Sequence, residues 1–251
     1  MKKTLVLGLI VCFVLGALVL SGCGGNTDTT STVLKMGTEA GFAPFEYKEG
    51  DNYLGIDVEI SQKIAEKLGM QLEIADMNFD SLLDALDAGT VDFIAAGMSI
   101  KPEREKQADF TVSYFNASQT VVLLNTNDTI QTIADLEGKK IGVQAGTTGN
   151  DEASLIKDAK VSAFTAFSEA ISALENGTVD AVIMDNFPAN SFAAKNSNLK
   201  LQEGLFAAEK YAFAIKKDNT ELYDKVNGAL QELIDDGTVQ AIIDKYSASL
   251  T

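Results

Sequence analysis

One stretch of this chain occurs twice. Phe79–Asp92 reads FDSLLDALDAGTVD, and Phe167–Asp180, 88 residues later, reads FSEAISALENGTVD, with 7 of 14 positions identical. A short apolar run that is typical of a buried strand follows each copy. A helix, a turn and a strand that recur at this spacing predict two lobes of similar design. Two lobes leave a cleft between them, and clefts are where small ligands bind.

The repeat also has a simpler interpretation. A helix, a glycine stop and a valine-rich strand form a common sequence pattern, and Gly-Thr-Val occurs a third time at Gly237–Val239, where a helical sequence follows. The tripeptide alone therefore indicates little. The shared phenylalanine, the shared Ala-Leu pair and the strand after each copy are what favour two lobes.

The start of the chain predicts export from the cytoplasm. Two lysines precede Leu5–Leu20, an uncharged apolar run of 16 residues, whereas a membrane-spanning helix needs about 20. A basic start and a short apolar run are typical of a secretory signal. The run ends in Leu20-Ser21-Gly22-Cys23, which resembles the lipobox of bacterial lipoproteins, in which the cysteine becomes the lipidated first residue. An ordinary signal with an unrelated cysteine is the alternative.

We therefore expect a signal peptide and a linker ahead of the mature domain. The signal peptide is expected at 1–22, and the small polar residues at 23–32 predict a flexible linker. Acyl chains at Cys23 would hold the mature protein outside the cytoplasmic membrane, at the cell surface or in a periplasm.

Composition excludes several kinds of site and partner. The chain has no histidine, and its two cysteines are Cys12 in the signal and Cys23. Ser-His-Asp and Cys-His triads and histidine-based zinc sites are therefore excluded, and neither a cofactor nor a metal is expected. Removal of Lys2 and Lys3 with the signal takes the formal net charge from -16 to -18. This charge argues against nucleic acid and anionic lipid as partners.

Strand and helix patterns alternate along the rest of the chain. Asp57–Leu68, for example, has the apolar spacing of an amphipathic helix and ends before Gly69, a typical helix stop. The alternation predicts an α/β protein with mainly parallel sheets. Ligands of such proteins bind beyond the carboxyl ends of the strands. This rule selects four loops, which follow Gly37, Ala96, Val143 and Met184.

Other segments are predicted with definite bounds. Glu39–Tyr47 is expected to be an aromatic-rich loop held by a proline, and Glu221–Tyr246 to be mostly helical. A strand at Thr120–Leu124 is expected to lead out of the first lobe. Tyr211–Ile215 is predicted to be another strand.

Two of the selected loops offer groups for an anion. After Ala96, Ser99 carries a hydroxyl and Arg104 a planar guanidinium that suits a carboxylate. The alternative for Arg104 is a solvated charge between two glutamates. After Val143, Gly146-Thr147-Thr148 at a helix start is a second candidate, although small polar residues also cap many helices.

A carboxylate follows the apolar strand Ala181–Met184. Asp185 at the cleft end of this strand can bind an ammonium group, and the repeat aligns it with Gly97 of the other lobe. The alternative is a cap for the helix that follows. Phe42 and Phe79 are candidates to flank a ligand, with ordinary core packing as their alternative.

Nearly all of 33–246 resembles a known family. The chain is similar to the polar amino-acid substrate-binding proteins of bacterial ABC importers, which include the glutamine-, arginine- and histidine-binding proteins. The motifs that carry the resemblance are GTEAGFAPFE (Gly37–Glu46), GIDV (Gly55–Val58), AGMSIKPER (Ala96–Arg104), GVQAGTT (Gly142–Thr148) and DGT (Asp236–Thr238). The resemblance implies a monomer that captures a polar amino acid for an ABC permease.

The resemblance also implies a fold. It is the two-lobed periplasmic-binding-protein-like fold of type II, in which a two-stranded hinge connects the lobes. Here the hinge would lie near Asn116–Thr120 and Lys210–Ala214. Lobe 1 would comprise 33–118 and 213–251, and lobe 2 would comprise 119–212.

Carried over onto this sequence, the resemblance implies how the amino-acid group would be bound. Arg104 would bind the α-carboxylate, with help from Ser99 and from a backbone N–H near Thr148. Asp185 would bind the α-ammonium together with the Gly97 carbonyl and the Ser99 hydroxyl.

The resemblance assigns the ligand side chain to other residues. Phe42 and Phe79 would flank it, and Glu39 and Gln144 would lie near its far end. A carboxylate there favours a cationic amino acid such as arginine, lysine or ornithine. Glutamine or a broad polar range is the alternative, because an amide N–H can also donate to Glu39. The complete expected set is Glu39, Phe42, Phe79, Ala96, Gly97, Ser99, Arg104, Gln144, Thr147, Thr148 and Asp185.

Two other classes of function are weighed against this one. Cyclohexadienyl dehydratase is an enzyme that resembles these binding proteins, but such a site must bind a substrate without an α-ammonium. An intact Asp185 beside Arg104 therefore argues against an enzyme. A receptor or sensor would need a further domain or a membrane span, and we expect none beyond the signal.

Overall fold

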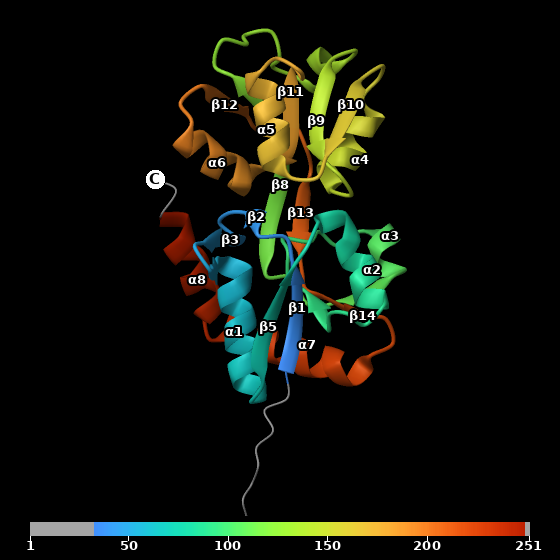
Figure 1. The fold of residues 1–251 in the computed structure, drawn as a ribbon, viewed down its shortest axis with the longest axis vertical. Helices are drawn as coiled ribbons and strands as arrows, with labels where there is room; N and C mark the ends of the chain where they lie inside the picture. Colours follow the sequence, from blue (N-terminus) through green and yellow to red (C-terminus); the bar gives the residue numbers. More distant parts are fainter. Residues whose placement is uncertain (1–32, 249–251) are drawn as a thin grey trace, which may run out of the picture. The chain divides into compact units, whose positions relative to one another are not determined.

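The computed structural model describes residues 33–248. The expected signal peptide at 1–22, the linker at 23–32 and the lipidated Cys23 lie outside the described residues. Two sheets with helices around them form two lobes (Figure 1). None of the helices in 33–248 has both the length and the apolar composition that crossing a membrane would take.

The first lobe contains a five-stranded sheet with the order β5-β1-β6-β14-β7. Its strands are β1 (Val33–Thr38), β5 (Gln71–Asp76), β6 (Phe93–Ile94), β7 (Ala108–Phe110) and β14 (Ala214–Lys216). Its helices are α1 (Ile56–Leu68), the 3-10 helix η1 (Phe79–Ser81), α2 (Leu82–Asp87), α3 (Pro102–Glu105), α7 (Thr220–Asp235) and α8 (Thr238–Ser247). Gly69 closes α1 in the left-handed conformation, as the sequence predicts.

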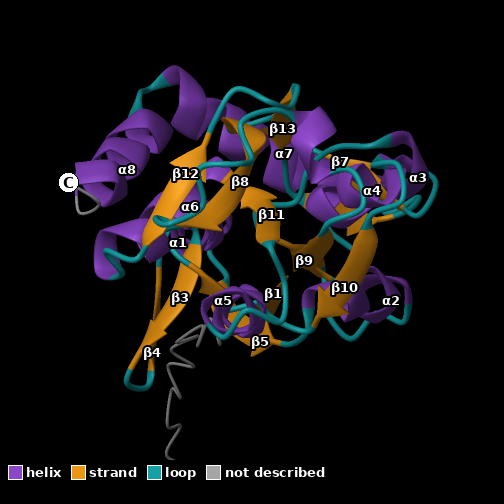
Figure 2. Cartoon of the chain, turned by 90° about the horizontal axis from the view of Figure 1, so that it is seen from above, coloured by secondary structure: helices purple, strands orange, loops and turns teal. Residues whose placement is uncertain are grey.

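The second lobe contains a sheet with the order β10-β9-β11-β8-β12, and β13 pairs with β8 beside it. Its strands are β8 (Phe115–Leu124), β9 (Lys140–Gln144), β10 (Lys160–Phe164), β11 (Ala181–Asp185), β12 (Leu199–Gln202) and β13 (Ala208–Tyr211). Its helices are the 3-10 helix η2 (Ile133–Leu136), α4 (Thr148–Leu155), α5 (Phe167–Glu175) and α6 (Asn186–Lys195). Figure 2 shows the strands from above with the helices around them.

Both sheets are mixed. In the first, β1 lies parallel to β5 and β6, while β14 runs antiparallel to β6 and β7. In the second, β9 lies parallel to β10 and β11, while β8 runs antiparallel to β11 and β12. β8 and β14 enter their sheets from the other lobe, so they arrive from the opposite end. The predicted α/β class with two lobes is confirmed, and this crossing explains why the sheets are not parallel throughout.

Two adjacent strands connect the lobes. β8 is ten residues long, and its first half pairs with β13 while its second half belongs to the second sheet. Figure 1 shows both strands between the two sheets. The predicted hinge segments, Asn116–Thr120 and Lys210–Ala214, fall on and beside these strands. The lobe boundaries at 118/119 and 212/213 stay a prediction.

Several predicted bounds are corrected. The expected strand at Thr120–Leu124 is only the second half of β8. The expected strand at Tyr211–Ile215 is divided between the end of β13 and the start of β14. The chain leaves the strand conformation at Ala212, whose N–H donates to the Met98 carbonyl of the first lobe at 3.2 Å. Strand propensity alone does not reveal such a change of partner.

The segment Glu39–Tyr47 is not a loop throughout, contrary to the prediction. It supplies β2 (Gly41–Phe42) and the start of β3 (Glu46–Glu49) to a small sheet that β4 (Asn52–Leu54) completes. Gly50, with φ of 60°, turns the chain between β3 and β4. This small sheet holds Phe42 beside the carboxyl end of β1.

The predicted helix at Glu221–Tyr246 is two helices. α7 and α8 meet at Gly237, where φ is 82°. A left-handed residue cannot continue a right-handed helix, so the chain starts a new one. The third Gly-Thr-Val therefore begins a helix, α8.

The repeated stretch makes the same contacts in both lobes. The Asp92 carboxylate accepts a hydrogen bond from the backbone N–H of Lys35 at 2.7 Å. The equivalent Asp180 accepts one from the backbone N–H of Lys140 at 2.8 Å. Each aspartate thus joins its turn to a central strand of its own sheet. The interpretation of the repeat as two lobes of similar design is confirmed.

Candidate ligand-binding site

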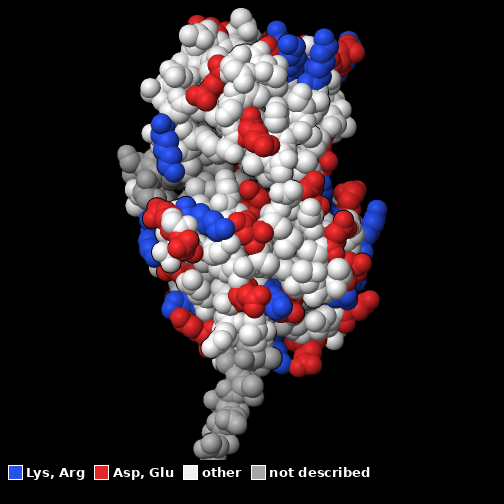
Figure 3. All heavy atoms as spheres, in the orientation of Figure 1, with Lys and Arg blue, Asp and Glu red and all other residues white. Residues whose placement is uncertain are grey.

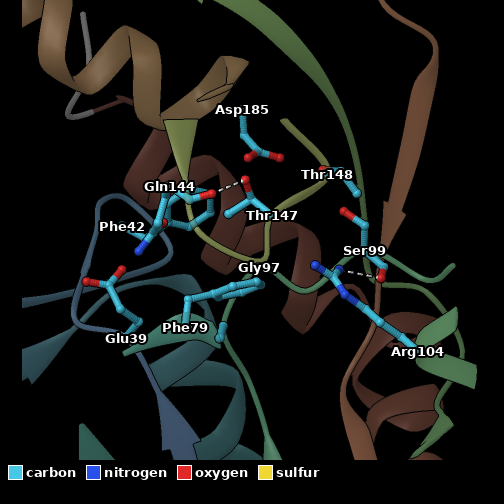
Figure 4. Close-up of a pocket in the computed structure, with 11 residues that line it drawn as sticks. Glu39, Phe42, Phe79, Gly97, Ser99, Arg104, Gln144, Thr147, Thr148 and Asp185 are labelled. Atoms are coloured by element: carbon cyan, nitrogen blue, oxygen red, sulfur yellow. Dashed lines mark hydrogen bonds between the residues drawn. The ribbon is translucent and has the colours of Figure 1, made fainter. Parts of the chain in front are cut away.

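The eleven residues that are expected to bind the ligand line one pocket. Figure 4 shows them pointing toward one another from the two lobes. From the first lobe come Glu39, Phe42, Phe79, Ala96, Gly97, Ser99 and Arg104, and from the second come Gln144, Thr147, Thr148 and Asp185. The structure therefore brings the whole set together, while its role in ligand binding stays a prediction.

Arg104 is a buried cation at one end of the pocket. It belongs to the short helix α3 and is only 3% exposed, so it is not the solvated charge that was the alternative. Its Nη1 donates to the Ser99 carbonyl at 2.8 Å and its Nη2 to the Gly146 carbonyl at 2.9 Å. The guanidinium lies 5.3 Å from the centre of the Phe79 ring. Burial lowers the pKa of Arg104 from its usual value.

Asp185 is a buried carboxyl group from the opposite lobe. It is the last residue of β11 and is 4% exposed. Although it precedes α6, its side chain makes no capping hydrogen bond to that helix. Instead it accepts a hydrogen bond from the Tyr211 hydroxyl. Burial, followed by the nearby charge of Glu209, raises the pKa of Asp185 to about 7.

Neither of these two groups forms an ion pair within residues 33–248. Among residues 33–248, no carboxylate lies within ion-pair distance of Arg104 and no lysine or arginine lies within that distance of Asp185. A buried charge without a partner costs several kcal/mol. The pocket is therefore suited to a molecule that carries both a carboxylate and an ammonium group.

The two threonines at the start of α4 differ in what they contact. Thr147 is the helix cap, because its hydroxyl oxygen accepts from the Asn150 N–H at 3.2 Å. The same hydroxyl donates to the Gln144 carbonyl at 2.8 Å. The Thr148 hydroxyl donates to Glu209 at 2.9 Å and accepts from the Gln119 amide at 2.9 Å. Thr147 therefore caps the helix, which was the alternative to anion binding. The hydroxyl of Thr148 does not cap the helix and is a hydrogen-bond donor at the pocket.

Gly97 allows the chain to approach Phe42 closely. Its φ is 52°, and a Cβ at this position would lie 2.6 Å from the Phe42 ring. Its N–H donates to the Asp57 carboxylate at 2.9 Å. Ala96, just before it, is buried.

Glu39 lies at the opposite end of the pocket from Arg104, as Figure 4 shows. Burial raises the pKa of Glu39 to about 6, against the lowering effect of the Gln144 side chain. Phe42 lies between the two ends and is also packed in the core, since its ring stacks on that of Phe167 at 5.8 Å. Phe42 therefore both lines the pocket and packs in the core.

Sequence reasoning missed several polar residues around the pocket. Glu209 and Tyr211 come from the connecting strand β13 and contact Ser99 and Asp185. Asp57 holds the Gly97 N–H from the start of α1. The motif Gly55–Val58 could have indicated that Asp57 lies near the pocket. The sequence around Glu209 has no motif that would have indicated this for Glu209.

The chain is similar to known proteins over nearly its whole length. Residues 34–249 match the family described as bacterial extracellular solute-binding proteins, family 3. The chain is 35% identical to a probable histidine-binding protein of Campylobacter jejuni, over 88% of this chain and 87% of that protein. It is 32% identical to the arginine-binding extracellular protein ArtP of Bacillus subtilis, over 98% of each. An ancestral arginine-binding protein bound to arginine superposes with a TM-score of 0.82 at 40% identity, over 85% of this chain and 97% of that one.

Proposed function

The chain belongs to the bacterial extracellular solute-binding proteins of family 3, and we propose that it binds a polar L-amino acid and delivers it to the permease of an ABC importer. The observation that carries the proposal is the pair of buried charges, Arg104 and Asp185, that face one pocket from different lobes. An L-amino acid supplies the partner that each of them needs.

In this proposal each end of the amino-acid group has its own partners. The α-carboxylate binds the guanidinium fork of Arg104, the Ser99 hydroxyl and the N–H groups at the start of α4. The α-ammonium binds the carboxylate of Asp185 and the Gly97 carbonyl. Only a ligand with both charges at the right separation satisfies both lobes.

We further propose that the ligand side chain is cationic, as in arginine, lysine or ornithine. Glu39 supports this, because it lies at the far end of the pocket and the pKa of about 6 leaves it mostly ionised at pH 7. The carboxylate can form a charge-assisted hydrogen bond with a cationic group. Glutamine, or a broad range of polar amino acids, is the alternative, because an amide can also donate to Glu39.

Capture by lobe closure is supported by contacts between the lobes. Arg104 reaches across to the Gly146 carbonyl. Lys101 of the first lobe pairs with Asp151 of the second. With the ligand enclosed, each buried charge exchanges water for a fixed partner, and a micromolar to nanomolar affinity corresponds to roughly 8 to 12 kcal/mol. The lobe boundaries 33–118 with 213–251, and 119–212, belong to this proposal.

We also propose that the protein is a monomer anchored outside the cytoplasmic membrane through lipid at Cys23. The support is the sequence of 1–23, with its basic start, apolar run and lipobox-like end. A dehydratase-like enzyme on the same fold is less favoured, because the buried carboxylate of Asp185 beside the carboxylate-binding Arg104 suits an α-amino acid.

A thermal-shift screen against the common amino acids, followed by titration calorimetry, tests the proposal. We expect a large shift with arginine, lysine or ornithine. Arg104→Ala should reduce affinity at least 100-fold, because a lost partner for a buried charge costs about 3 kcal/mol or more. Lys106→Ala, an exposed cation two residues away, is the matched control.

The outcomes separate the alternatives. A shift with glutamine alone would remove the cationic assignment, and unchanged affinity in Arg104→Ala would remove the assigned carboxylate contact. No shift with any amino acid would overturn the binding proposal and favour the enzyme alternative.

A further inference from the structure

Besides Glu39 and Asp185, a third carboxylate lies near the pocket. It is that of Glu209, and it lies at the end that is proposed to bind the α-carboxylate and α-ammonium groups of the ligand. Its Oε2 accepts a hydrogen bond from the Ser99 hydroxyl at 2.5 Å and another from the Thr148 hydroxyl at 2.9 Å. Ser99 belongs to the first lobe and Thr148 begins α4 of the second. Glu209 itself is on β13, the strand that connects the lobes, and its side chain is partly exposed.

The geometry leaves these hydroxyls no second hydrogen to donate. A hydroxyl has a single O–H, so it can donate to only one acceptor at a time. The Thr148 oxygen is also held from the other side by the Gln119 amide at 2.9 Å. Its hydrogen therefore points at Glu209. The Ser99 hydroxyl, which the proposed function assigns to the ligand, is used by Glu209 in the same way.

Glu209 also acts on the two charges that would bind the ligand. Its negative charge opposes the effect of burial on Arg104, because it raises the pKa of that guanidinium. It also contributes to the raised pKa of Asp185. Glu209 is thus close enough to compensate Arg104 in part, which is what a ligand carboxylate would do.

We propose that Glu209 is a built-in competitor of the ligand α-carboxylate: it holds the Ser99 and Thr148 hydroxyls and must turn away when an amino acid binds. This inference rests on the proposed function. Two carboxylates near the same donors repel each other, so both cannot remain. Because Glu209 is partly exposed, its side chain can rotate into water at low cost. Competition of this kind weakens binding and speeds release, which suits a protein that must hand its ligand to a permease.

The proposal predicts an unusual gain of affinity on removing a polar group from a binding pocket. In titration calorimetry of the full-length protein in detergent, Glu209→Ala should bind L-arginine about tenfold more tightly, which corresponds to 1.4 kcal/mol. Glu209→Gln, which keeps the shape and removes the charge, should change affinity in the same direction by a smaller factor. Glu203→Ala, an exposed glutamate in the preceding turn, is the matched control and should stay within twofold.

A second probe separates competition from general electrostatics. L-argininamide lacks the carboxylate, so it does not need the donors that Glu209 holds. It should bind Glu209→Ala no more tightly than it binds the wild type, because loss of a negative charge weakens the binding of a cation. The same pair of measurements with L-glutamine and L-glutaminamide extends the test to the alternative ligand.

Each result decides the matter. Weaker binding of L-arginine by Glu209→Ala would mean that Glu209 contacts the ligand. Unchanged binding would mean that Glu209 does not compete with it. Either result overturns the inference and leaves the proposed function standing. If wild type and variants bind neither amino acid, the proposed function and the inference are both overturned. Binding by Glu209→Ala alone would support a competitor strong enough to block the wild type.

Discussion

At the scale of single residues, buried carboxyl groups dominate the pocket and its surroundings. Burial is the largest cause of the raised pKa in Glu39, Glu46, Asp57 and Asp185. Such groups are costly when ionised, so each needs a donor or a cation. Asp57 has two donors, the Tyr114 hydroxyl at 2.6 Å and the Gly97 N–H at 2.9 Å. Glu39, Glu46 and Asp185 differ in how many hydrogen-bond donors their carboxyl groups have.

Glu39 offers a test of ligand charge. Glu39→Gln should weaken L-arginine binding by roughly 30-fold, since a hydrogen bond to a charged group contributes about 2 kcal/mol. Binding of L-glutamine should change only a few-fold, because the new amide can still accept a hydrogen bond. Titration calorimetry measures both, with the exposed Glu73→Gln as control. Equal losses for the two ligands would contradict the assignment of Glu39 to the side chain.

Glu46 offers a test of stability against pH. Both of its carboxyl oxygens are buried without an N–H or O–H donor from the described residues, and burial beside Asp57 raises its pKa well above the usual value. The same burial raises the pKa of Asp57 to about 7. The folded state therefore binds more protons than the unfolded state from about pH 4 upward, and stability is lost as pH rises toward 7 and beyond.

The free energy of unfolding should accordingly fall by at least about 1 kcal/mol between pH 5 and pH 8. Glu46→Gln removes one ionising group, so it should be more stable than the wild type at pH 8 and show a weaker pH dependence. Denaturant unfolding at several pH values measures this. Glu49→Gln, exposed on the same strand, should follow the wild type. Identical pH profiles for Glu46→Gln and the wild type would rule out this origin of the effect.

At the scale of elements, glycines of positive φ mark the ends of several helices. The repeat helices and α1 each stop at a glycine of positive φ, and Gly237 with φ of 82° separates α7 from α8. The apolar periodicity continues across Gly237, which is why the sequence predicted a mostly helical Glu221–Tyr246. Only the backbone conformation of Gly237 divides this segment into α7 and α8.

Gly237 and Gly228 form a matched pair for a stability measurement. Neither has an atom within 4 Å of where a Cβ would lie, so an added methyl group meets no steric obstacle. Gly237→Ala should destabilise by about 1 kcal/mol, because alanine is strained at positive φ. Gly228→Ala, inside α7, should stabilise by roughly 0.5–1 kcal/mol. Denaturant unfolding checks both signs, and destabilisation by both substitutions would show that contacts rather than backbone conformation decide.

At the scale of the whole molecule, two lobes of similar design supply opposite charges to one pocket. The surface carries both signs, and Figure 3 shows lysines and carboxylates on both lobes of the face in view. With a formal net charge of -16 for the full chain, repulsion keeps the protein away from anionic surfaces.

Cys23 tests where the whole molecule resides. In cells fed a labelled fatty acid, the full-length protein should incorporate the label and stay with the membrane fraction, since two or more acyl chains give stable anchoring. Cys23→Ser should lose the label and leave that fraction. Cys12→Ser, within the apolar run, is the matched control. A labelled membrane protein in the Cys23→Ser variant would contradict the lipobox interpretation.

The sequence by itself determined the class of fold and the composition of the pocket. The doubled stretch and the strand-end rule led to Gly97 and Asp185, and the resemblance completed the set that lines one pocket. Gly97 and Asp185 could be found in this way because they depend on local pattern: a strand, its turn and the residues just after it.

Only the tertiary structure decided which of these groups contact each other and which residues support them. Ser99 and Glu209 are 110 residues apart in sequence yet hydrogen bonded, and Tyr211 reaches Asp185 across 26 residues. The division of the strand expected at Tyr211–Ile215 arises where the chain crosses back from the second lobe to the first. Such contacts depend on packing between segments distant in sequence, which no local periodicity records, and so the carboxylate of Glu209 became visible only in the folded molecule.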